Sequence, residues 1–550
     1  MATTITPYGG VNEIGGCKIL VEDRETRIFL DFGRAFIRYG DYFDGIFVRE
    51  RRTRGILDLL LLGLIPPLEG LYREDLIPAI DSTVSFWERF RNKPCYRDLR
   101  RDGPAVDAII LSHAHLDHTA DLAFICPDIP VFSSRMTAFI AKAMQDTSKP
   151  GALGIVYINP NKEEEGLLLA DSKQGYIWRR WAFLDGKPEG EVNASDPFAS
   201  PLSFWLWRPA KQSKHSPEPK IHKEAPPINL LWWSVDHSIF GATGFAIETT
   251  SGWIAYTGDF RFHGFHHYAS KRFMEALSAL HPRVLLCEGT YLNLSEQPVT
   301  EEQVHDNCLA AVRKAEGKLV IADFAPRNVE RLLTFLDIAR ETGRRLLIQP
   351  KDAYLLMAMH LADPNLVPDF TQEPYLTLYN DPKGRKDLWE KLIREAYKAK
   401  IEGPENVQRC PGEYILAFSL WDVVDLLDVE YIMGKTPGGV YIYSNSKAYD
   451  EEQKVDLVRL WNWIQHFGME PVGLQPVARD LARRVTEVDV VPGYHASGHA
   501  SGQELLRFVK EVHPEILIPI HTEQPHWWVE ELKGLGIRIE ISNQAQPIGC

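Results

Sequence analysis

Cysteine is scarce and unpatterned in this 550-residue sequence. Its 7 cysteines never form a C-x-x-C pair, which excludes an obvious disulfide framework or thiolate zinc site and favours a reducing, cytoplasmic setting. Long apolar runs are also lacking, since the longest, Gly55 to Pro66 (GILDLLLLGLIP), is short and contains Asp58. The opening MATTITPYGG has no basic region followed by an apolar run. We therefore expect neither a signal peptide nor a membrane span.

The sequence has no excess of positive charge. Its formal net charge is −14 and its pI is near 5.7, which argues against non-specific coating of nucleic acid, although a local basic channel can exist on an acidic protein. With 45% hydrophobic and 25% charged residues, the chain has the composition of a globular protein with two or three hydrophobic cores. Composition alone does not indicate a substrate.

Short β-rich runs separated by turns dominate the first 290 residues. Two of them surround a polar turn in Lys18 to Gly33, and a third, Ala105 to His113, ends in histidines. Further runs follow at 229–234, 243–249, 253–257 and 283–287. Between Gln145 and Pro227 the sequence is irregular, and we interpret this stretch as an insertion of mixed strands and loops.

From about Thr300 the pattern changes to alternating helices and strands, which is typical of βαβ units. A helix is predicted from about Arg327 to Thr342, where apolar residues recur at i, i+3, i+4 and i+7, and Gly343 is a good stop signal. Another helix is predicted near Val455 to Phe467. These features indicate a second domain from about 290 to 485.

Four residues of the metal-ligand type lie within six positions just after a predicted strand. They are His113, His115, Asp117 and His118 in LSHAHLDHTAD. Neutral imidazole and carboxylate are ligands that zinc prefers, and a zinc site with an open position lowers the pKa of water to about 7. A single such histidine would more often be a hydrogen-bonded core or loop residue, but this density favours a metal centre.

Two later residues have ambiguous signals when each is taken alone. His237 follows the run at 229–234, in SVDHSIFGATG, and Asp259 follows the run at 253–257, in YTGDFR. A loop histidine and a turn-forming aspartate are the commoner interpretations of such patterns. Their order along the chain, after the histidine cluster, is what favours metal binding.

The ordered set of Asp31 in FLDFG, the HAHLDH segment, His237 and Asp259 resembles the four signature motifs of the metallo-β-lactamase superfamily. The resemblance implies an α/β fold, the αββα sandwich. It implies two zinc ions, with Mn²⁺ or Mg²⁺ as alternatives. His113, His115 and His237 would hold one ion and Asp117 and His118 the other, Asp259 would bridge them, and Asp31 would orient the histidine cluster.

Three further motifs resemble the β-CASP branch, whose members are nucleases with an inserted α/β cap domain. They are Glu288 in LLCEGTY, His499 in GYHASGHASGQEL and His521 in LIPIHTE. Cap and closing segments are similar to ribonuclease J. The resemblance implies a first domain over 1–290, a cap over 291–485 and a return segment over 486–550, with His521 as a further metal ligand that favours RNA over DNA.

The same resemblance implies hydrolysis of phosphodiester bonds in single-stranded RNA, with 5′-to-3′ exonuclease action. Asp117, Glu288 and His499 would be catalytic, with His499 as the proton donor. The loop that contains His495, Ser497 and Gly498 would bind the substrate phosphate. A simple turn is the alternative for that loop. Rival functions are a single-stranded DNA nuclease, a small-ester hydrolase and a non-catalytic RNA-processing subunit, and a homodimer is an open alternative.

The chain departs from ribonuclease J in two places. The cap segment GEYILAFSLWDVVDLL is apolar and acidic, and Ser419 is the only polar residue retained from the family's Ser- and Gln-containing stretch. The insertion between Gln145 and Pro227 contains tryptophans and arginines that could stack bases beside phosphates. Packing in the core of an inserted sheet is the commoner interpretation of these aromatics, and we favour it; the residues are Trp178, Arg179, Arg180, Trp181, Trp205, Trp207 and Arg208.

Overall fold

A computed structural model describes residues 3–44, 47–79, 84–149, 153–171, 173–209, 222, 224–293, 297–382 and 384–550. Part of the predicted insertion between Gln145 and Pro227 lies outside these ranges. Within them, every helix is too short or too polar to span a bilayer.

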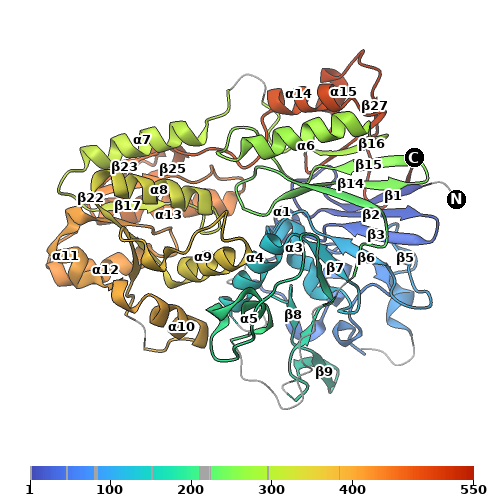
Figure 1. Cartoon of the computed structure of the whole chain (residues 1–550), viewed down its shortest axis with the longest axis horizontal. Coiled ribbons are helices and arrows are strands. Elements are labelled where there is room, and N and C mark those ends of the chain that lie inside the picture. The colour runs from blue at the N-terminus through green and yellow to red at the C-terminus, as the bar shows by residue number, and fades with distance from the viewer. Residues whose placement is uncertain are drawn as a thin grey trace.

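Two sheets form the half of the molecule that lies to the right in Figure 1. The first has the order β12-β7-β6-β3-β2-β1-β28 and the second the order β13-β14-β15-β16-β26-β27. The strands of the first sheet are β1 (Thr4–Gly9), β2 (Lys18–Asp23), β3 (Thr26–Leu30), β6 (Ala108–Ile110), β7 (Val131–Ser133), β12 (Trp181–Phe183) and β28 (Ile548–Gly549). The strands of the second are β13 (Leu230–Ser234), β14 (Thr243–Thr249), β15 (Gly252–Tyr256), β16 (Val284–Glu288), β26 (Ile516–Ile520) and β27 (Arg538–Ile539).

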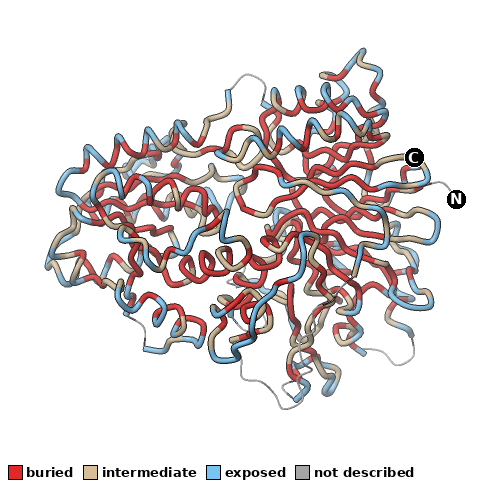
Figure 2. The backbone as a smooth tube through the Cα atoms, in the orientation of Figure 1, coloured by how far each residue is buried: buried red, intermediate tan, exposed pale blue. Residues whose placement is uncertain are grey.

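The two sheets pack face to face because apolar side chains alternate along their strands. In β2 and β3, Ile19 and Ile28 belong to the core between the sheets, while their neighbours Leu20 and Phe29 face the opposite side. The second sheet supplies residues such as Ile254 to the same inner core. Figure 2 shows both sheets as largely buried.

Helices cover the outer face of each sheet. α4 (Arg135–Asp146) packs on the first sheet, and α6 (His267–Leu280) and α14 (Gly502–Val512) pack on the second. The order of layers is therefore helix, sheet, sheet, helix. This confirms the predicted αββα sandwich.

The other half of the molecule is an α/β unit around an all-parallel sheet (Figure 1). The strand order is β20-β19-β18-β21-β17-β22-β23. The strands are β17 (Val320–Asp323), β18 (Arg345–Ile348), β19 (Leu376–Tyr379), β20 (Ile401–Glu402), β21 (Tyr414–Leu416), β22 (Gly439–Tyr443) and β23 (Met469–Val472). The helices around it are α7 (Glu301–Lys314), α8 (Val329–Thr342), α9 (Pro350–Ala362), α10 (Leu388–Ala396), α11 (Pro404–Arg409), α12 (Leu426–Met433) and α13 (Glu451–His466). We call this unit the cap.

The predicted βαβ pattern of the cap is confirmed, including the end of α8. Asn328 caps its first turn by accepting from the Arg331 N–H, and Gly343 ends it in the left-handed conformation, with φ of 66°. Domain boundaries at residues 290 and 485 stay a prediction. The remaining elements are α1 (Phe36–Gly40), α2 (Leu57–Leu61), α3 (Leu116–Thr119), α5 (Pro201–Leu206), α15 (His526–Glu531), β4 (Leu68–Glu69), β5 (Arg97–Asp98), β8 (Tyr157–Ile158), β9 (Asn161–Glu164), β10 (Leu167–Ala170), β11 (Ile177–Trp178), β24 (Leu474–Arg479) and β25 (Val485–Val490).

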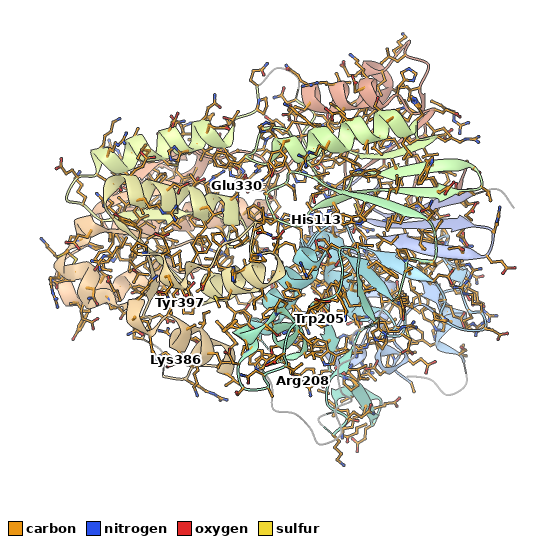
Figure 3. The ribbon with its side chains drawn as sticks, viewed as in Figure 1. His113, Trp205, Arg208, Glu330, Lys386 and Tyr397 are labelled. Carbon is orange, nitrogen blue, oxygen red and sulfur yellow. The ribbon has the colours of Figure 1, made fainter. Side chains whose placement is uncertain are left out.

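The stretch from Gln145 to Pro227 contributes a strand to the first domain. β12 pairs in parallel with β7 and so forms the edge of the first sheet, which a three-residue strand does not reveal in a sequence pattern. The core interpretation of the tryptophans is confirmed, because Trp181 and Trp205 are 1% and 2% exposed. Figure 3 labels Trp205 and Arg208 in this region.

Candidate metal centre and cleft

The histidine cluster lies where two parallel strands of the first sheet end. β3 and β6 pair up to Leu30 and Ile110, so Asp31 and the segment after residue 110 leave the sheet side by side. Asp31 turns the chain with a φ of 56°, a conformation that aspartate tolerates better than most residues. This turn directs its carboxylate toward the base of the histidine cluster.

Three imidazoles form the first ligand group. The Nδ1 atom of His115 lies 3.1 Å from Nε2 of His113 and 3.1 Å from Nε2 of His237. His237 follows β13, and its other ring nitrogen, Nδ1, donates to the Gly498 carbonyl at 2.5 Å. That hydrogen bond leaves Nε2 as the nitrogen with a free lone pair, directed at the other two rings.

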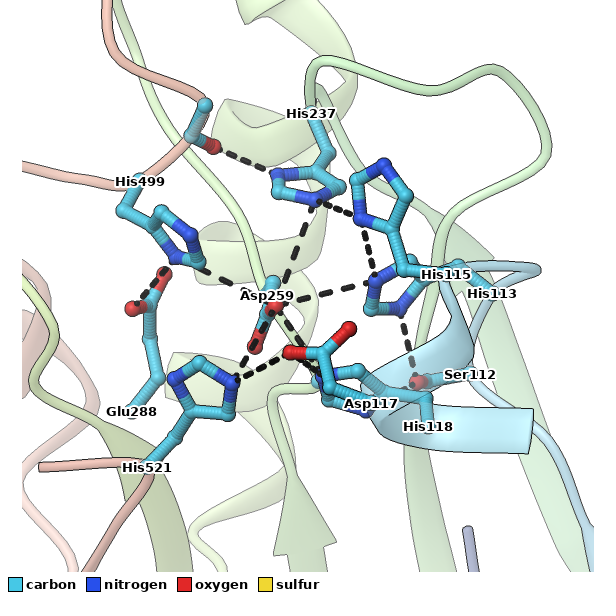
Figure 4. A network of polar contacts seen from close by, with 12 residues as sticks. Ser112, His113, His115, Asp117, His118, His237, Asp259, Glu288, His499 and His521 are labelled. Carbon is cyan, nitrogen blue, oxygen red and sulfur yellow. Dashed lines mark hydrogen bonds and ion pairs between the residues drawn. The ribbon is translucent and has the colours of Figure 1, made fainter. Parts of the chain in front are cut away.

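The second ligand group combines Asp117, His118, Asp259 and His521, whose ligand atoms all lie within 4.8 Å of one another. Asp259 Oδ2 is 3.1 Å from His118 Nε2 and 3.6 Å from His113 Nε2, so this carboxylate lies between the two groups (Figure 4). Asp117 Oδ2 is 3.2 Å from His521 Nε2. All seven residues that the sequence predicted as metal ligands are brought together.

His521 reaches the site through a long-range strand pairing. β26 runs parallel to β16, and its last residue, Ile520, lies opposite Glu288, the last residue of β16. His521 directly follows β26, so it lies next to the end of β16. The residue adopts a φ of 49°, and its N–H donates to the Gly10 carbonyl at 2.7 Å. This sharp turn at the strand end directs the ring toward Asp117.

Asp31 lies below the cluster and orients it. Its Oδ2 accepts from the Ser112 and Tyr256 hydroxyls at 2.7 and 2.6 Å and lies 2.7 Å from His118 Nδ1, while Oδ1 accepts from the Ser112 N–H at 2.7 Å. Asp31 is 0% exposed. The carboxylate fixes the His118 ring with Nε2 facing the other ligands. Ser112 and Tyr256 were not predicted, although Ser112 directly precedes the cluster in sequence.

Thr290 is a further residue that sequence reasoning missed. Its hydroxyl lies 2.7 Å from His521 Nδ1 and donates to Glu288 Oε2 at 2.8 Å. Thr290 therefore links the predicted acidic residue to the most distant ligand. Its position in LLCEGTY, two residues after Glu288, was the available signal.

His499 and Glu288 form a pair at the edge of the metal centre (Figure 4). Glu288 is 0% exposed and its Oε2 lies 3.0 Å from His499 Nδ1, while Oε1 accepts from the Phe260 N–H at 3.0 Å. Burial opposes a charge on the His499 ring, but the carboxylates of Glu288 and Asp259 raise its pKa to about 9. The geometry therefore favours a protonated ring with Nδ1 occupied by Glu288.

The loop that contains His495, Ser497 and Gly498 closes over this pair. The Ser497 hydroxyl accepts from the His499 N–H at 3.1 Å, and its carbonyl accepts from Arg261 at 2.9 Å. A Cβ on Gly498 would lie 2.6 Å from the Ser238 Oγ and 3.1 Å from the His237 ring, so a larger residue would require these side chains to shift. His495 Nδ1 is buried and has no hydrogen-bond partner among the described residues.

Arg261 belongs to a buried charge cluster that joins the cap to the first domain, and sequence reasoning did not find it. Its guanidinium contacts Asp236 at 3.3 Å, Glu301 on α7 at 3.0 Å and Glu330 on α8. Arg331, also on α8, pairs with Glu301 at 2.8 Å. All five side chains are at most 3% exposed. The loop that carries His499 is therefore held at the junction between the two units.

The chemistry of the donor set fits divalent metal ions. Burial is the main cause that lowers the pKa of His113, His115 and His237 well below the ordinary value, so these rings are neutral and have lone pairs available. His118 Nε2 and Asp259 Oδ1 are buried and accept or donate no hydrogen bond among the described residues. Buried nitrogen atoms and carboxylate oxygens that converge in this way are the ligands that a divalent cation takes in proteins.

A cleft of about 650 Å³ opens beside the metal centre between the first domain and the cap. The first domain contributes Phe36, His115 and Asp117 to its walls. The cap contributes polar and basic groups, among them Arg327, Ser419, Asn445, Ser446 and Lys447. A substrate bound to both units therefore passes the candidate metal ligands.

Two family models match segments of the chain on either side of the cap. The "Beta-lactamase superfamily domain" matches residues 79–163, and the "Zn-dependent metallo-hydrolase RNA specificity domain" matches residues 487–539. These segments contain the histidine cluster, His499 and His521. With the ribonuclease J relatives below, these matches support a ribonuclease J-like chain, similar to the β-CASP branch of the metallo-β-lactamase superfamily.

Curated proteins that are similar to this chain include several ribonucleases J. The chain is 22% identical to ribonuclease J 1 of Streptococcus pyogenes serotype M3 over 82% of its own length and 66% of the relative's. It is 20% identical to ribonuclease J of Helicobacter pylori over 95% of its length and 56% of the relative's. It is 26% identical to ribonuclease J of Corynebacterium glutamicum over 58% of its own length and 40% of the relative's. The chain thus spans about two fifths to two thirds of the length of these relatives.

A solved structure shares the whole fold. A protein of unknown function from Enterococcus faecalis V583 superposes with a TM-score of 0.63 at 19% identity, and the match covers 100% of both chains. The match to the zinc-dependent family model and the clustered histidines and aspartates both support metal binding.

Proposed function

We propose that this protein is a metal-dependent ribonuclease that hydrolyses phosphodiester bonds of single-stranded RNA in the cleft between the first domain and the cap. The observation that carries the proposal is the position of the His499–Glu288 pair beside two facing ligand groups that share Asp259. The names of the relatives and of the matched RNA specificity domain support RNA as the substrate.

In this proposal His113, His115 and His237 hold one zinc ion, and Asp117, His118 and His521 hold the other. Asp259 lies between the groups and would contact both ions. Two bound ions would lower the pKa of the attacking water and stabilise negative charge on the phosphoryl oxygens. Although burial opposes its charge, His118 and His521 lower the pKa of Asp117, so this carboxylate stays ionised as a ligand.

His499 donates the proton to the leaving oxygen. Glu288 occupies its Nδ1 and raises its pKa, so the ring is charged near neutral pH and its Nε2–H is available to the substrate. Arg261 donates a hydrogen bond to the carbonyl of Ser497, two residues before His499, and so holds the loop in place. The proton donor and the ligands are thus oriented before substrate binds.

The loop around His499 holds the scissile phosphate in this proposal. His495 contributes the nitrogen that lacks a protein partner, and the absence of a side chain at Gly498 lets the backbone approach closely. Burial is the main cause that lowers the pKa of His495 to about 3, so the ring is neutral and donates to phosphate only in the tautomer with the proton on Nδ1. The Ser497 hydroxyl already accepts from the His499 N–H and can still donate to phosphate.

We also propose 5′-to-3′ exonuclease action, in keeping with the ribonuclease J relatives. Arg327 and Lys447 from the cap supply positive charge to the cleft that a terminal phosphate would require. Ser419 also lines this cleft, where its hydroxyl donates to Asp422 at 2.8 Å. A cytoplasmic setting and a homodimer stay predictions.

Digestion of a 5′-monophosphorylated, 3′-labelled single-stranded RNA tests the proposal. Zinc-loaded wild type is expected to degrade it and to release mononucleotides, whereas Asp259→Ala, Asp117→Ala and His499→Ala leave it intact. Asp107→Ala is the matched control, because Asp107 pairs with Arg101 outside the site. Intact RNA with wild type, together with cleavage of single-stranded DNA or of a chromogenic ester, would contradict RNA as the substrate.

A further inference from the structure

A strongly basic segment stands out in this acidic chain. Residues 49–54 (RERRTR) contain four arginines within six positions, whereas the whole chain has a net charge of −14. The segment lies at the surface, where Arg51 and Arg52 are exposed. Local positive charge on a negative protein indicates a binding surface for an anion rather than a general effect of composition.

Exposed aromatic and apolar side chains accompany these arginines. Phe36 on α1 is 46% exposed, Tyr42 is 48% exposed and Phe47 is 89% exposed. Next to them lies a groove of about 560 Å³, which Phe36, Tyr39 and Arg52 help to line. Rings interleaved with arginines are the combination by which proteins bind single-stranded nucleic acid, because rings stack on bases and arginines contact phosphates.

The groove is continuous with the cleft at the metal centre. Phe36 and Leu116 line both the groove and the cleft, and Leu116 stands between the candidate ligands His115 and Asp117. Figure 1 shows α1 beside α3, the short helix that begins at Leu116 and carries Asp117. A chain that leaves the metal centre past Phe36 therefore enters the arginine-lined groove.

The arginines differ in how far protein carboxylates neutralise them. Arg34 contacts Asp121 at 3.0 Å, and Arg51 contacts Asp58 at 2.5 Å. In the part of the chain that the structure describes, Arg52 makes no ion pair, and Arg54 donates to a backbone carbonyl. Arg52, which lines the groove, is thus the arginine whose charge is available to a ligand there.

We propose that this groove binds the single-stranded part of an RNA that extends out of the cleft, with Phe36 stacked on a base and Arg52 against a phosphate. The inference rests on the proposed function for the identity of the nucleic acid. Phe36 is the ring best placed to stack, because the Tyr39 ring is covered by the Arg34 guanidinium at 4.8 Å. A peptide ligand is disfavoured, since an unpaired arginine next to an exposed ring suits a phosphate and its base.

Equilibrium binding of fluorescein-labelled phosphorothioate oligouridines of about 4 and about 15 nucleotides tests this inference, since phosphorothioates resist hydrolysis. The groove is expected to contribute to the longer ligand only. Phe36→Ala should weaken binding of the longer ligand by about tenfold, the loss of one stacked base. Phe36→Tyr should restore it. Arg52→Gln should reduce the slope of log affinity against log salt by about 0.7, the value for one phosphate contact on a single strand.

Arg313→Gln is the matched control, because Arg313 is an exposed arginine on α7 whose side chain is 60% exposed. It should leave both affinities unchanged. If Phe36→Ala and Arg52→Gln bind the longer ligand as tightly as wild type, or weaken both lengths equally, the inference is wrong. Binding and cleavage are separate readouts. Length-dependent binding without RNA cleavage would support the groove and contradict the proposed ribonuclease. RNA cleavage by wild type, with variants that bind the longer ligand as tightly as wild type, would support the ribonuclease and contradict the groove.

Discussion

Replacement of Asp31 by asparagine tests how the second metal site is held together. The carboxylate accepts at both oxygens, with Oδ2 facing the Ser112 and Tyr256 hydroxyls and the His118 ring, and Oδ1 facing the Ser112 N–H. An amide must direct its NH₂ group at one of these two sets. In one orientation the NH₂ group faces the His118 ring nitrogen that donates to Oδ2, and in the other it faces the Ser112 N–H, so two donors meet in a fully buried position.

The size of the effect follows from these contacts. A hydrogen bond to a charged group contributes about 1.5–3 kcal/mol, so Asp31→Asn should lower the free energy of unfolding by about 3 kcal/mol. Loss of the partner that orients a metal-bound histidine weakens metal affinity by about 10- to 100-fold. Because His118 belongs to the group with Asp117 and His521, that loss should fall on one of the two metal equivalents.

Metal content and chelator competition provide the assay. Wild type dialysed against a graded chelator should release two zinc equivalents in a narrow range, whereas Asp31→Asn should release one equivalent at a chelator concentration about 10- to 100-fold lower. Asp107→Asn, at a partly exposed ion pair, is the control and should match wild type. Equal loss of both equivalents, or unchanged affinity, would refute the assignment of His118 to one site and of Asp31 to its support.

Three further predictions follow from buried groups. Glu288→Gln should lower kcat on RNA by about 100-fold and move the alkaline limb of the pH–rate profile to lower pH, because the pKa of His499 loses the carboxylate that raises it; an unmoved limb would contradict the proton-donor role. Burial raises the pKa of Asp323 to about 7, so the stability it contributes is full below about pH 4 and is lost as pH rises through 7. Asp323→Asn keeps the acceptor for the Tyr441 hydroxyl. Between pH 5 and 7 the free energy of unfolding of the wild type, measured in urea, should fall with pH more steeply than that of the variant, by about 1.4 kcal/mol per pH unit. Identical pH profiles of the two proteins would contradict the raised pKa. Gly498→Ala should cut activity by at least about tenfold while zinc content stays at the wild-type value, since the added Cβ displaces the His499 loop; full activity would show that the loop yields without consequence.

Local patterns predicted much of the fold because they report on burial and turns. The strands that precede His113, His237 and Asp259 were predicted from apolar runs, and the end of α8 from Gly343. β12 was not predicted, because three residues next to a polar loop carry too little periodicity to indicate which sheet they join. Pairing at the edge of a sheet is decided by tertiary contacts that a sequence window does not contain.

The site divides in the same way. The histidine cluster is local in sequence, so its chemistry was visible from spacing, whereas the place of His521 depended on a family resemblance. Thr290 and Arg261 each lie within two residues of a predicted site residue, yet their partners are on distant segments. Threonine and arginine are common surface residues, and nothing in the single sequence distinguished these two.

The parallel register of β16 and β26 has a consequence for the order in which the metal centre is completed during synthesis. His113, His115 and His237 belong to the early part of the chain and can meet before the cap exists. Asp117 and His521 are 404 positions apart, so the second ligand group closes only when the whole cap has been made and the return strand has docked beside β16. If the proposed function holds, a nascent chain would bind one ion before the second, and hydrolysis would begin only with the finished molecule.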